Sequence, residues 1–404
     1  MSIVYLIFIL LTAYFSYRYD SIEEYDSHKQ HRLWLMCGYL ICLTGFSYGL
    51  GGDKFVYMDE FEFYPSTFSE AYDYIVTGLL TRGQMPLWTL VNIFCKSIFN
   101  SFYAVQLIQS AAINIAVCYI VSKYTHRYFL FLLLYFFSLK YFIFNCEVMR
   151  EGFALAIMMI GMHGYMNGRK WLFYVLLPFA LMFHISAIIT ILFPLVNIKL
   201  SWKTLYIAIG LSFVLWLASD LVMGKILSLA FGGQSVFAAK VMFYSLQASS
   251  IFGYLRYLLT YLLFPYIIMY FMIQYEPDEK IKKIRIKLTS YMVVLSIIAV
   301  SIYPLARFYN YVQIFYLCMF ADFLFILFRN YEHLVIRVGT SVGTILLMFW
   351  FYFSHYETTN TYYYDFFYPY TCILNENKGV YFRSVAHDEA TNPQVTDKNT
   401  RDIE

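Results

Sequence analysis

The feature that most constrains this chain is a series of apolar stretches close to the length of a membrane span. The hydrocarbon core of a bilayer is about 30 Å thick, and about 20 helical residues cross it. The chain is 60% hydrophobic and 14% charged, whereas a soluble domain carries about 25% charged residues. This excludes a soluble globular fold. The candidate spans are 3–17, 33–50, 101–122, 128–145, 151–166, 204–219, 251–273, 288–303, 308–328 and 338–353.

The basic residues orient these spans, because cytoplasmic connections carry an excess of Lys and Arg. Segment 274–287 holds five basic residues and is predicted to be cytoplasmic. Counting spans outward from it assigns five more segments to the same side. Together the six hold 16 of the 29 basic residues, and the other five are 18–32, 123–127, 167–170, 197–203 and 329–337.

Two further apolar regions do not read as simple spans. Region 171–196 contains Pro178, His184 and Pro194, and basic residues bracket it on both sides. It is therefore predicted to form two half-spans that meet near His184, or a re-entrant hairpin. Region 86–99 is likewise predicted to enter the membrane and return to the same side, or to pack flat against the membrane surface. Such breaks are tolerated where protein or a wet cavity satisfies the freed backbone groups.

These segments predict one all-α polytopic membrane domain over residues 1–383, with about 12 transmembrane segments that include broken or re-entrant helices. Longer external loops are expected near 51–85 and 220–250. Residues 384–404 form a polar tail that is predicted to be disordered, because it has little apolar content.

Ionisable groups near membrane depth are costly and usually face a cavity with partners. The topology places seven of them at the external ends of spans: Asp53, Arg82, Arg150, Glu151, His184, Arg256 and Arg307. Each also has a purely structural interpretation. Arg150 and Glu151 could form a helix-end ion pair, Arg256 could snorkel to the surface, and Asp53 could cap a helix. His184 could bond a carbonyl freed by Pro178.

Several arginines below an external surface suit a lipid pyrophosphate, since guanidinium groups stay charged and bind phosphate oxygens in pairs. Tyrosine and tryptophan rings suit sugars at headgroup level. The motifs Gly-x-Ser-x-Gly, His-Glu-x-x-His, Walker A and Gly-x-Gly-x-x-Gly are absent, as is Asp-x-Asp. No metal and no cofactor are expected. The net charge of +3 is too small to indicate nucleic acid.

Four stretches resemble the EpsG-like group of Wzy-type polysaccharide polymerases. Gly51-Gly52-Asp53-Lys54-Phe55-Val56-Tyr57, followed by Phe61, is similar to the group's external motif. The others are Arg150-Glu151-Gly152-Phe153-Ala154, Phe183-His184-Ile185-Ser186-Ala187 and Arg307-Phe308-Tyr309-Asn310-Tyr311. One departure is Gln84-Met85-Pro86, where the group often has an acidic residue before the proline. This weakens a catalytic role for the element that begins at Pro86.

The resemblance implies a helical bundle of the GT-C-like glycosyltransferase type in the bacterial inner membrane, with its active site facing the periplasm. It would join undecaprenyl-pyrophosphate-linked oligosaccharides into capsule, O-antigen or exopolysaccharide, without a metal. Membrane lipid and a chain-length regulator are candidate partners. A flippase for the same lipid-linked unit and an O-antigen ligase are the alternatives. A flippase should carry charge along its whole path, whereas the cytoplasmic halves of the spans are apolar, with Lys140 the main exception.

For such a polymerase, Arg150 and Arg307 are predicted to bind the pyrophosphate, with Arg256 or Arg82 assisting. His184 is the first candidate for orienting or deprotonating the acceptor hydroxyl, because its unperturbed pKa lies near neutral pH. Asp53 and Glu151 are the alternative bases. Tyr57 and Tyr309 are predicted to contact the sugars.

Overall fold

The computed structural model of the protein describes residues 2–82, 84–219, 251–330, 343, 363–374 and 383. The predicted loop near 220–250 and the tail 384–404 lie outside the described residues, and so does nearly all of the predicted span 338–353. Within the described part every regular element is helical, and the one β-bridge joins Ser47 to Cys372. The all-α prediction is therefore confirmed for this part of the chain.

Four helices in the described part are long and apolar enough to cross a membrane: Phe102–Tyr124, Ile251–Gln274, Glu279–Ser301 and Leu305–Phe328. A bent pair, Tyr128–Phe137 with Lys140–Glu147, is a fifth candidate. Several shorter apolar helices, of 10 to 17 residues, accompany them. The expected total of about 12 spans and the GT-C-like arrangement remain predictions.

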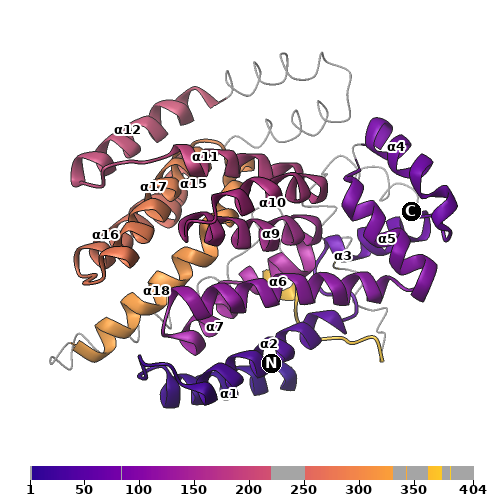
Figure 1. The fold of residues 1–404 in the computed structure, drawn as a ribbon, viewed down its shortest axis with the longest axis horizontal. Coiled ribbons are helices and arrows are strands. Elements are labelled where there is room, and N and C mark those ends of the chain that lie inside the picture. The colour runs from indigo at the N-terminus through magenta and orange to yellow at the C-terminus, as the bar shows by residue number, and fades with distance from the viewer. Residues whose placement is uncertain are drawn as a thin grey trace, which may run out of the picture.

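The first half of the chain supplies α1 to α9, and Figure 1 shows α6 crossing the molecule with α9 and α10 on one side of it and α1 and α2 on the other. Their bounds are α1 Ile3–Tyr19, α2 Ser27–Gly45, α3 Asp53–Glu62, η1 Phe68–Glu70, α4 Ala71–Arg82, α5 Pro86–Phe99, α6 Phe102–Tyr124, α7 Tyr128–Phe137, α8 Lys140–Phe142, η2 Ile143–Glu147 and α9 Met149–Met166.

The second half adds a group of helices that packs beside α9 and α6 (Figure 1). Their bounds are α10 Lys170–Phe183, η3 Ile185–Ile191, α11 Leu192–Leu195, α12 Trp202–Leu217, α15 Ile251–Tyr257, η4 Leu258–Leu263, α16 Phe264–Gln274, α17 Glu279–Ser301, η5 Tyr303–Tyr309, α18 Asn310–Asn330 and η6 Tyr363–Phe366.

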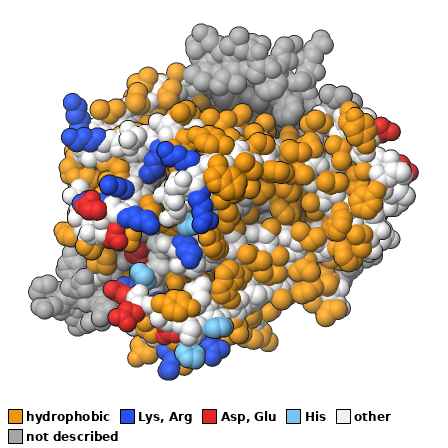
Figure 2. Space-filling view, viewed as in Figure 1, with side chains coloured by type: hydrophobic (Ala, Val, Ile, Leu, Met, Phe, Trp, Pro, Cys, Tyr) orange, Lys and Arg blue, Asp and Glu red, His pale blue; other side chains and the backbone are white. Residues whose placement is uncertain are grey.

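Among the described residues, four of the connections predicted to be cytoplasmic meet at one end of the molecule, called here the basic end: 18–32, 123–127, 197–203 and 274–287. Lys29 donates to the carbonyl of His126 at 2.6 Å, and Thr125 donates to Asp322 at 2.6 Å. Lys287 donates to the carbonyl of Val196 at 2.6 Å. Figure 2 shows charged side chains gathered at the left end of one face, beside a broad apolar surface. This clustering agrees with the predicted topology.

The predicted break near His184 is confirmed. Helix α10 ends at Phe183, His184 is extended with φ −156° and ψ 130°, and the 3-10 helix η3 begins at Ile185. The chain then returns to the basic end, where Lys287 donates to the carbonyls of Pro194 and Val196.

The candidate span 128–145 is a bent pair of helices and not one straight helix. Helices α7 and α8 with η2 are bent by 78° around Leu139, which has a φ of 60°. A bend at this depth leaves backbone groups without helical partners, so neighbouring helices must satisfy them. Gln109 of α6 donates to the carbonyl of Phe144 at 2.8 Å, and Asn145 donates to that of Tyr141 at 2.7 Å. The apolar composition of the run concealed this bend.

A buried polar layer between α2, α6 and the bend fixes the start of the external segment. The side chain of Gln106 donates to the carbonyls of Thr44, Gly45 and Ser47 at 2.7 to 2.9 Å. These bonds satisfy carbonyl groups at the C-terminal end of α2 that have no partner within the helix. Asn145 accepts from Thr44 at 3.1 Å and from Asn114 at 2.9 Å. These contacts hold residues 47–52 against η2.

Helix α5 contacts the end of α3, which precedes it in the chain. Lys96 near its end donates to the carbonyls of Phe61 and Glu62 at 3.1 and 2.7 Å, at the end of α3. The expectation that α5 either enters the bilayer and returns or lies flat on it remains a prediction.

Candidate functional site

The first part of the site is the turn before α3, which wraps around the carboxylate of Glu147. The backbone N–H groups of Gly52 and Asp53 donate to its two oxygens at 2.9 and 3.2 Å. Gly51 has a φ of +87°, and a Cβ there would lie 2.7 Å from Glu147 Oε1. Glycine is needed at this position for both reasons. The Gly-Gly-Asp motif is thus explained by a close approach of backbone to carboxylate.

Lys54 reinforces this turn from the inside. Its side chain is fully buried, its Nζ donates to Ser47 Oγ at 3.2 Å, and Cys146 Sγ lies at 3.9 Å. Its charge also acts on Glu147. Burial lowers the pKa of Lys54, because removing an ammonium group from water disfavours its charged form.

Arg150, in the first turn of α9, lies directly beside α3. Its guanidinium carbon is 5.3 Å from the centre of the Tyr57 ring, and the Tyr57 hydroxyl donates to the carbonyl of Glu147 at 3.3 Å. The charges of Glu60 and Arg150 also act on each other. Arg150 is partly exposed.

A row of aromatic rings leads from Arg150 to the break after α10. Tyr57 contacts Trp88 edge-on at 5.4 Å between ring centres, and Trp88 contacts Phe153 at 6.3 Å. Phe153 stacks on Phe183 at 4.6 Å with an interplanar angle of 14°. Since Phe183 precedes His184, this row connects the arginine motif with the histidine motif.

Glu151 points into a second polar cluster, formed with α8 and the start of α18. Its side chain is 1% exposed, and Asn310 Nδ2 donates to Oε1 at 3.1 Å. Lys140 Nζ donates to Asn310 Oδ1 at 3.2 Å. The charges of Arg307 and Lys140 both act on the Glu151 carboxyl. Glu151 Oε2 is buried and has no hydrogen-bond partner among the described residues.

His184 joins this cluster through Ser186 and Tyr311. The Ser186 N–H donates to His184 Nδ1 at 3.2 Å, and Ser186 Oγ lies 2.6 Å from the same nitrogen. The Tyr311 hydroxyl is 2.9 Å from Ser186 Oγ. Because Nδ1 accepts from a backbone N–H, the proton of the neutral ring resides on Nε2.

The structure therefore brings most of the predicted site residues into two adjoining groups. The first contains Asp53, Tyr57 and Arg150, and the second contains Glu151, His184 and Arg307. Three predicted residues lie elsewhere or are not described: Tyr309 packs edge-on against Tyr261 at 5.0 Å, Arg256 is exposed on α15, and the side chain of Arg82 lies outside the described part.

Sequence reasoning did not select five residues that the structure places in these groups: Lys140, Glu147, Ser186, Asn310 and Tyr311. The last three lie inside the quoted motifs, so the motifs contained a signal for them. Lys140 is the exception among the apolar cytoplasmic halves, and the structure places it just after the bend at Leu139, where it donates to Asn310.

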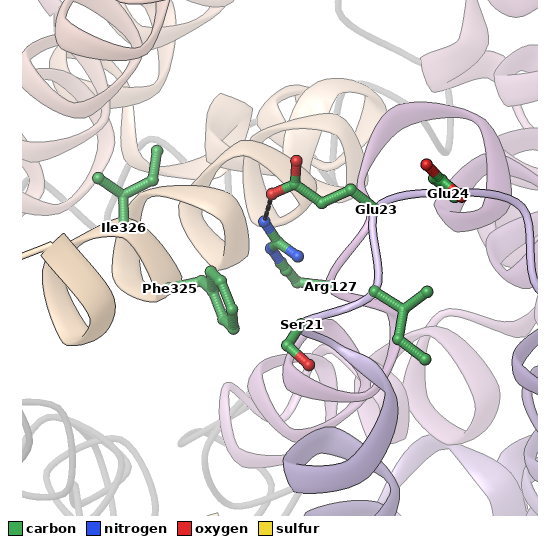
Figure 3. A pocket seen from close by; sticks show the side chains of 7 residues that line it. Ser21, Glu23, Glu24, Arg127, Phe325 and Ile326 are labelled. Atoms are coloured by element: carbon green, nitrogen blue, oxygen red, sulfur yellow. Dashed lines mark hydrogen bonds and ion pairs between the residues drawn. The ribbon is translucent and has the colours of Figure 1, made fainter.

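A separate charged network closes the basic end. Arg285 binds Glu276 at 2.8 Å and Asp322 at 3.3 Å, and Asp322 was not singled out from the sequence. Arg127 binds Glu23 at 2.6 Å and stacks 3.7 Å from the Phe325 ring centre. These last three residues line a pocket of about 590 Å³ (Figure 3). It is formed by residues outside the four motifs.

No group of three or more His, Cys, Asp or Glu side chains in the described part is arranged to hold a metal ion. The expectation of a metal-independent reaction rests on the sequence and remains a prediction.

Comparison with known proteins assigns the chain to a family. The model of the EpsG family matches residues 32–372, which include all four motifs. The chain belongs to the EpsG family. The resemblance seen in the four motifs of this EpsG family member is thereby confirmed, and the family points to a membrane protein of polysaccharide biosynthesis. No curated protein and no solved structure matches the chain.

Proposed function

We propose that this EpsG family member is a polymerase that joins undecaprenyl-pyrophosphate-linked oligosaccharide units at the periplasmic face of the bacterial inner membrane. One observation carries the proposal. Four motifs that are far apart in the sequence meet around Arg150 and Glu151, at the ends of helices away from the basic end.

In the proposed reaction, a hydroxyl oxygen of the acceptor unit attacks the anomeric carbon of the donor chain. The bond between that carbon and the pyrophosphate oxygen breaks, and undecaprenyl pyrophosphate leaves with the electron pair. Arg150 and Arg307 are partly exposed cations from different elements, and they stabilise the charge that develops on the leaving group. The donor is already activated, so no nucleotide is needed.

Glu151 is assigned as the base that takes the proton of the acceptor hydroxyl. Its Oε1 accepts from Asn310, whereas Oε2 is buried without a hydrogen-bond partner in the described structure. A buried oxygen of this kind is costly unless a ligand donates to it. An acceptor hydroxyl meets that requirement and delivers its proton at the same atom. Asp53 is the alternative base.

His184 is assigned a different task from the one expected first. Nδ1, the basic nitrogen of its neutral ring, already accepts from Ser186. Nε2–H can therefore donate to a phosphate or sugar oxygen, which orients the substrate. The row of rings from Tyr57 to Phe183 is buried, and it connects this histidine with Arg150.

Reconstitution tests this proposal. Purified protein in proteoliposomes receives the lipid-linked repeat unit of its own strain, without nucleotide sugars and with a chelator. The proposal predicts a ladder of longer lipid-linked chains and release of undecaprenyl pyrophosphate. Translocation of the unit without chain growth would indicate a flippase. Growth only after addition of a different acceptor would indicate a ligase. Either result would contradict a polymerase.

A further inference from the structure

Lys140 is the most unusual charged residue that the proposed chemistry leaves without a task. It lies within an apolar run of aromatic and aliphatic residues, directly after the bend at Leu139. Leu139 adopts a left-handed conformation, which costs a non-glycine residue about 1–2 kcal/mol. The bend is therefore energetically unfavourable for the backbone, and Lys140 is the first residue after it.

The contacts of Lys140 define the orientation of a neighbouring amide. Its ammonium group can only donate, so Asn310 must present Oδ1 to it, at 3.2 Å. The Asn310 amide then has only Nδ2 for its other neighbour, and Nδ2 donates to Glu151 Oε1 at 3.1 Å. Without Lys140 the amide could rotate and turn an oxygen toward the carboxylate.

We propose that Lys140 is a positioning residue of the polymerase site, which acts through Asn310 to hold the Glu151 carboxylate in place for the acceptor hydroxyl. Lys140 fixes the amide, and the amide fixes Oε1 of Glu151, so that Oε2 faces the acceptor. The positive charge of Lys140 also acts on the Glu151 carboxyl. This inference rests on the proposed function.

Three substitutions separate the charge of Lys140 from its hydrogen bond to Asn310. Lys140→Arg keeps the charge and a donor, Lys140→Gln keeps a donor without the charge, and Lys140→Met removes both. A matched control is Lys287→Met, because Lys287 is also partly exposed and also donates to protein oxygens, but at the basic end.

The assay is chain growth in proteoliposomes at several concentrations of the lipid-linked unit. Lys140→Met is expected to lower kcat by about 100-fold, the scale of a small misplacement at an active site, with KM changed less than about threefold. Lys140→Arg should restore most of kcat, Lys140→Gln should fall between, and Lys287→Met should match the wild type. A Lys140→Met enzyme with wild-type kcat would overturn the inference, as would an arginine variant as slow as the methionine variant.

A second measurement does not depend on activity. Thermal unfolding of Lys140→Met, Glu151→Gln and the double variant forms a double-mutant cycle. The proposal predicts that the double variant loses clearly less stability than the sum of the two single losses. Additive losses would overturn the contact. If wild-type protein formed no chains while the cycle showed coupling, the proposed function would fail and the Lys140 contact would stand.

Discussion

Replacement of Gly51 by alanine tests whether the turn before α3 is built around Glu147. Gly51 has a φ of +87°, which costs an alanine about 1–2 kcal/mol. The new Cβ would lie 2.7 Å from Glu147 Oε1 and 3.0 Å from Cys146 Cβ, so the carboxylate must move. Each hydrogen bond to a charged group contributes about 1.5–3 kcal/mol. Loss of one such bond brings the expected destabilisation to about 3–5 kcal/mol.

The assay is thermal unfolding of the purified protein in detergent, followed by tryptophan fluorescence. Gly38→Ala is the control, because Gly38 lies in α2 and a Cβ there meets no atom within 4 Å. Alanine favours a helix over glycine by about 1 kcal/mol, so this variant should unfold at the wild-type temperature or above it. A Gly51→Ala protein as stable as the wild type would refute the reasoning.

Three further predictions concern other parts of the molecule. Gln106→Leu should lower the unfolding temperature well below that of the exposed Gln274→Leu variant, because it removes the side-chain donor to the buried carbonyls of Gly45 and Ser47; equal effects would contradict this. His126 lies in a connection at the basic end, where burial and then the charges of Lys29 and Arg127 lower its pKa. The unfolded chain therefore binds its proton at higher pH, so stability should fall as the pH drops below about 6.5, and His126→Asn should reduce that loss; an unchanged pH dependence would contradict it. Glu151→Gln keeps an acceptor for Asn310 but cannot take a proton, so chain growth should fall at least about 100-fold at unchanged protein level; wild-type growth would exclude Glu151 as the base.

Hydrophobic length and loop charge were sufficient to predict the helical class and that several basic connections share one end of the molecule. The break at His184 was also predictable, because basic residues on both sides of 171–196 require the chain to return. Both arguments use properties of whole segments, which a single sequence displays directly.

The bend at Leu139 could not be predicted in the same way. No glycine or proline marks it, and the residues that satisfy the bent backbone, such as Gln109, belong to another helix. For the same reason the sequence could not connect Lys140 with Asn310, which is 170 positions away. Charge placement and motif resemblance both selected Arg150, Glu151, His184 and Arg307, but only the three-dimensional contacts show which residues lie beside each of them.

The proposed function depends most directly on Arg150 and Arg307 binding one pyrophosphate. Lysine keeps the charge but lacks the paired donors of arginine. Chain growth in proteoliposomes should therefore fall at least about 100-fold in Arg150→Lys and in Arg307→Lys, the scale of losing one preorganised donor to a developing charge. Arg32→Lys is the control, because Arg32 is exposed and lies near the N-terminal end of α2. This variant should match the wild type. Wild-type chain growth by both site variants would contradict the account.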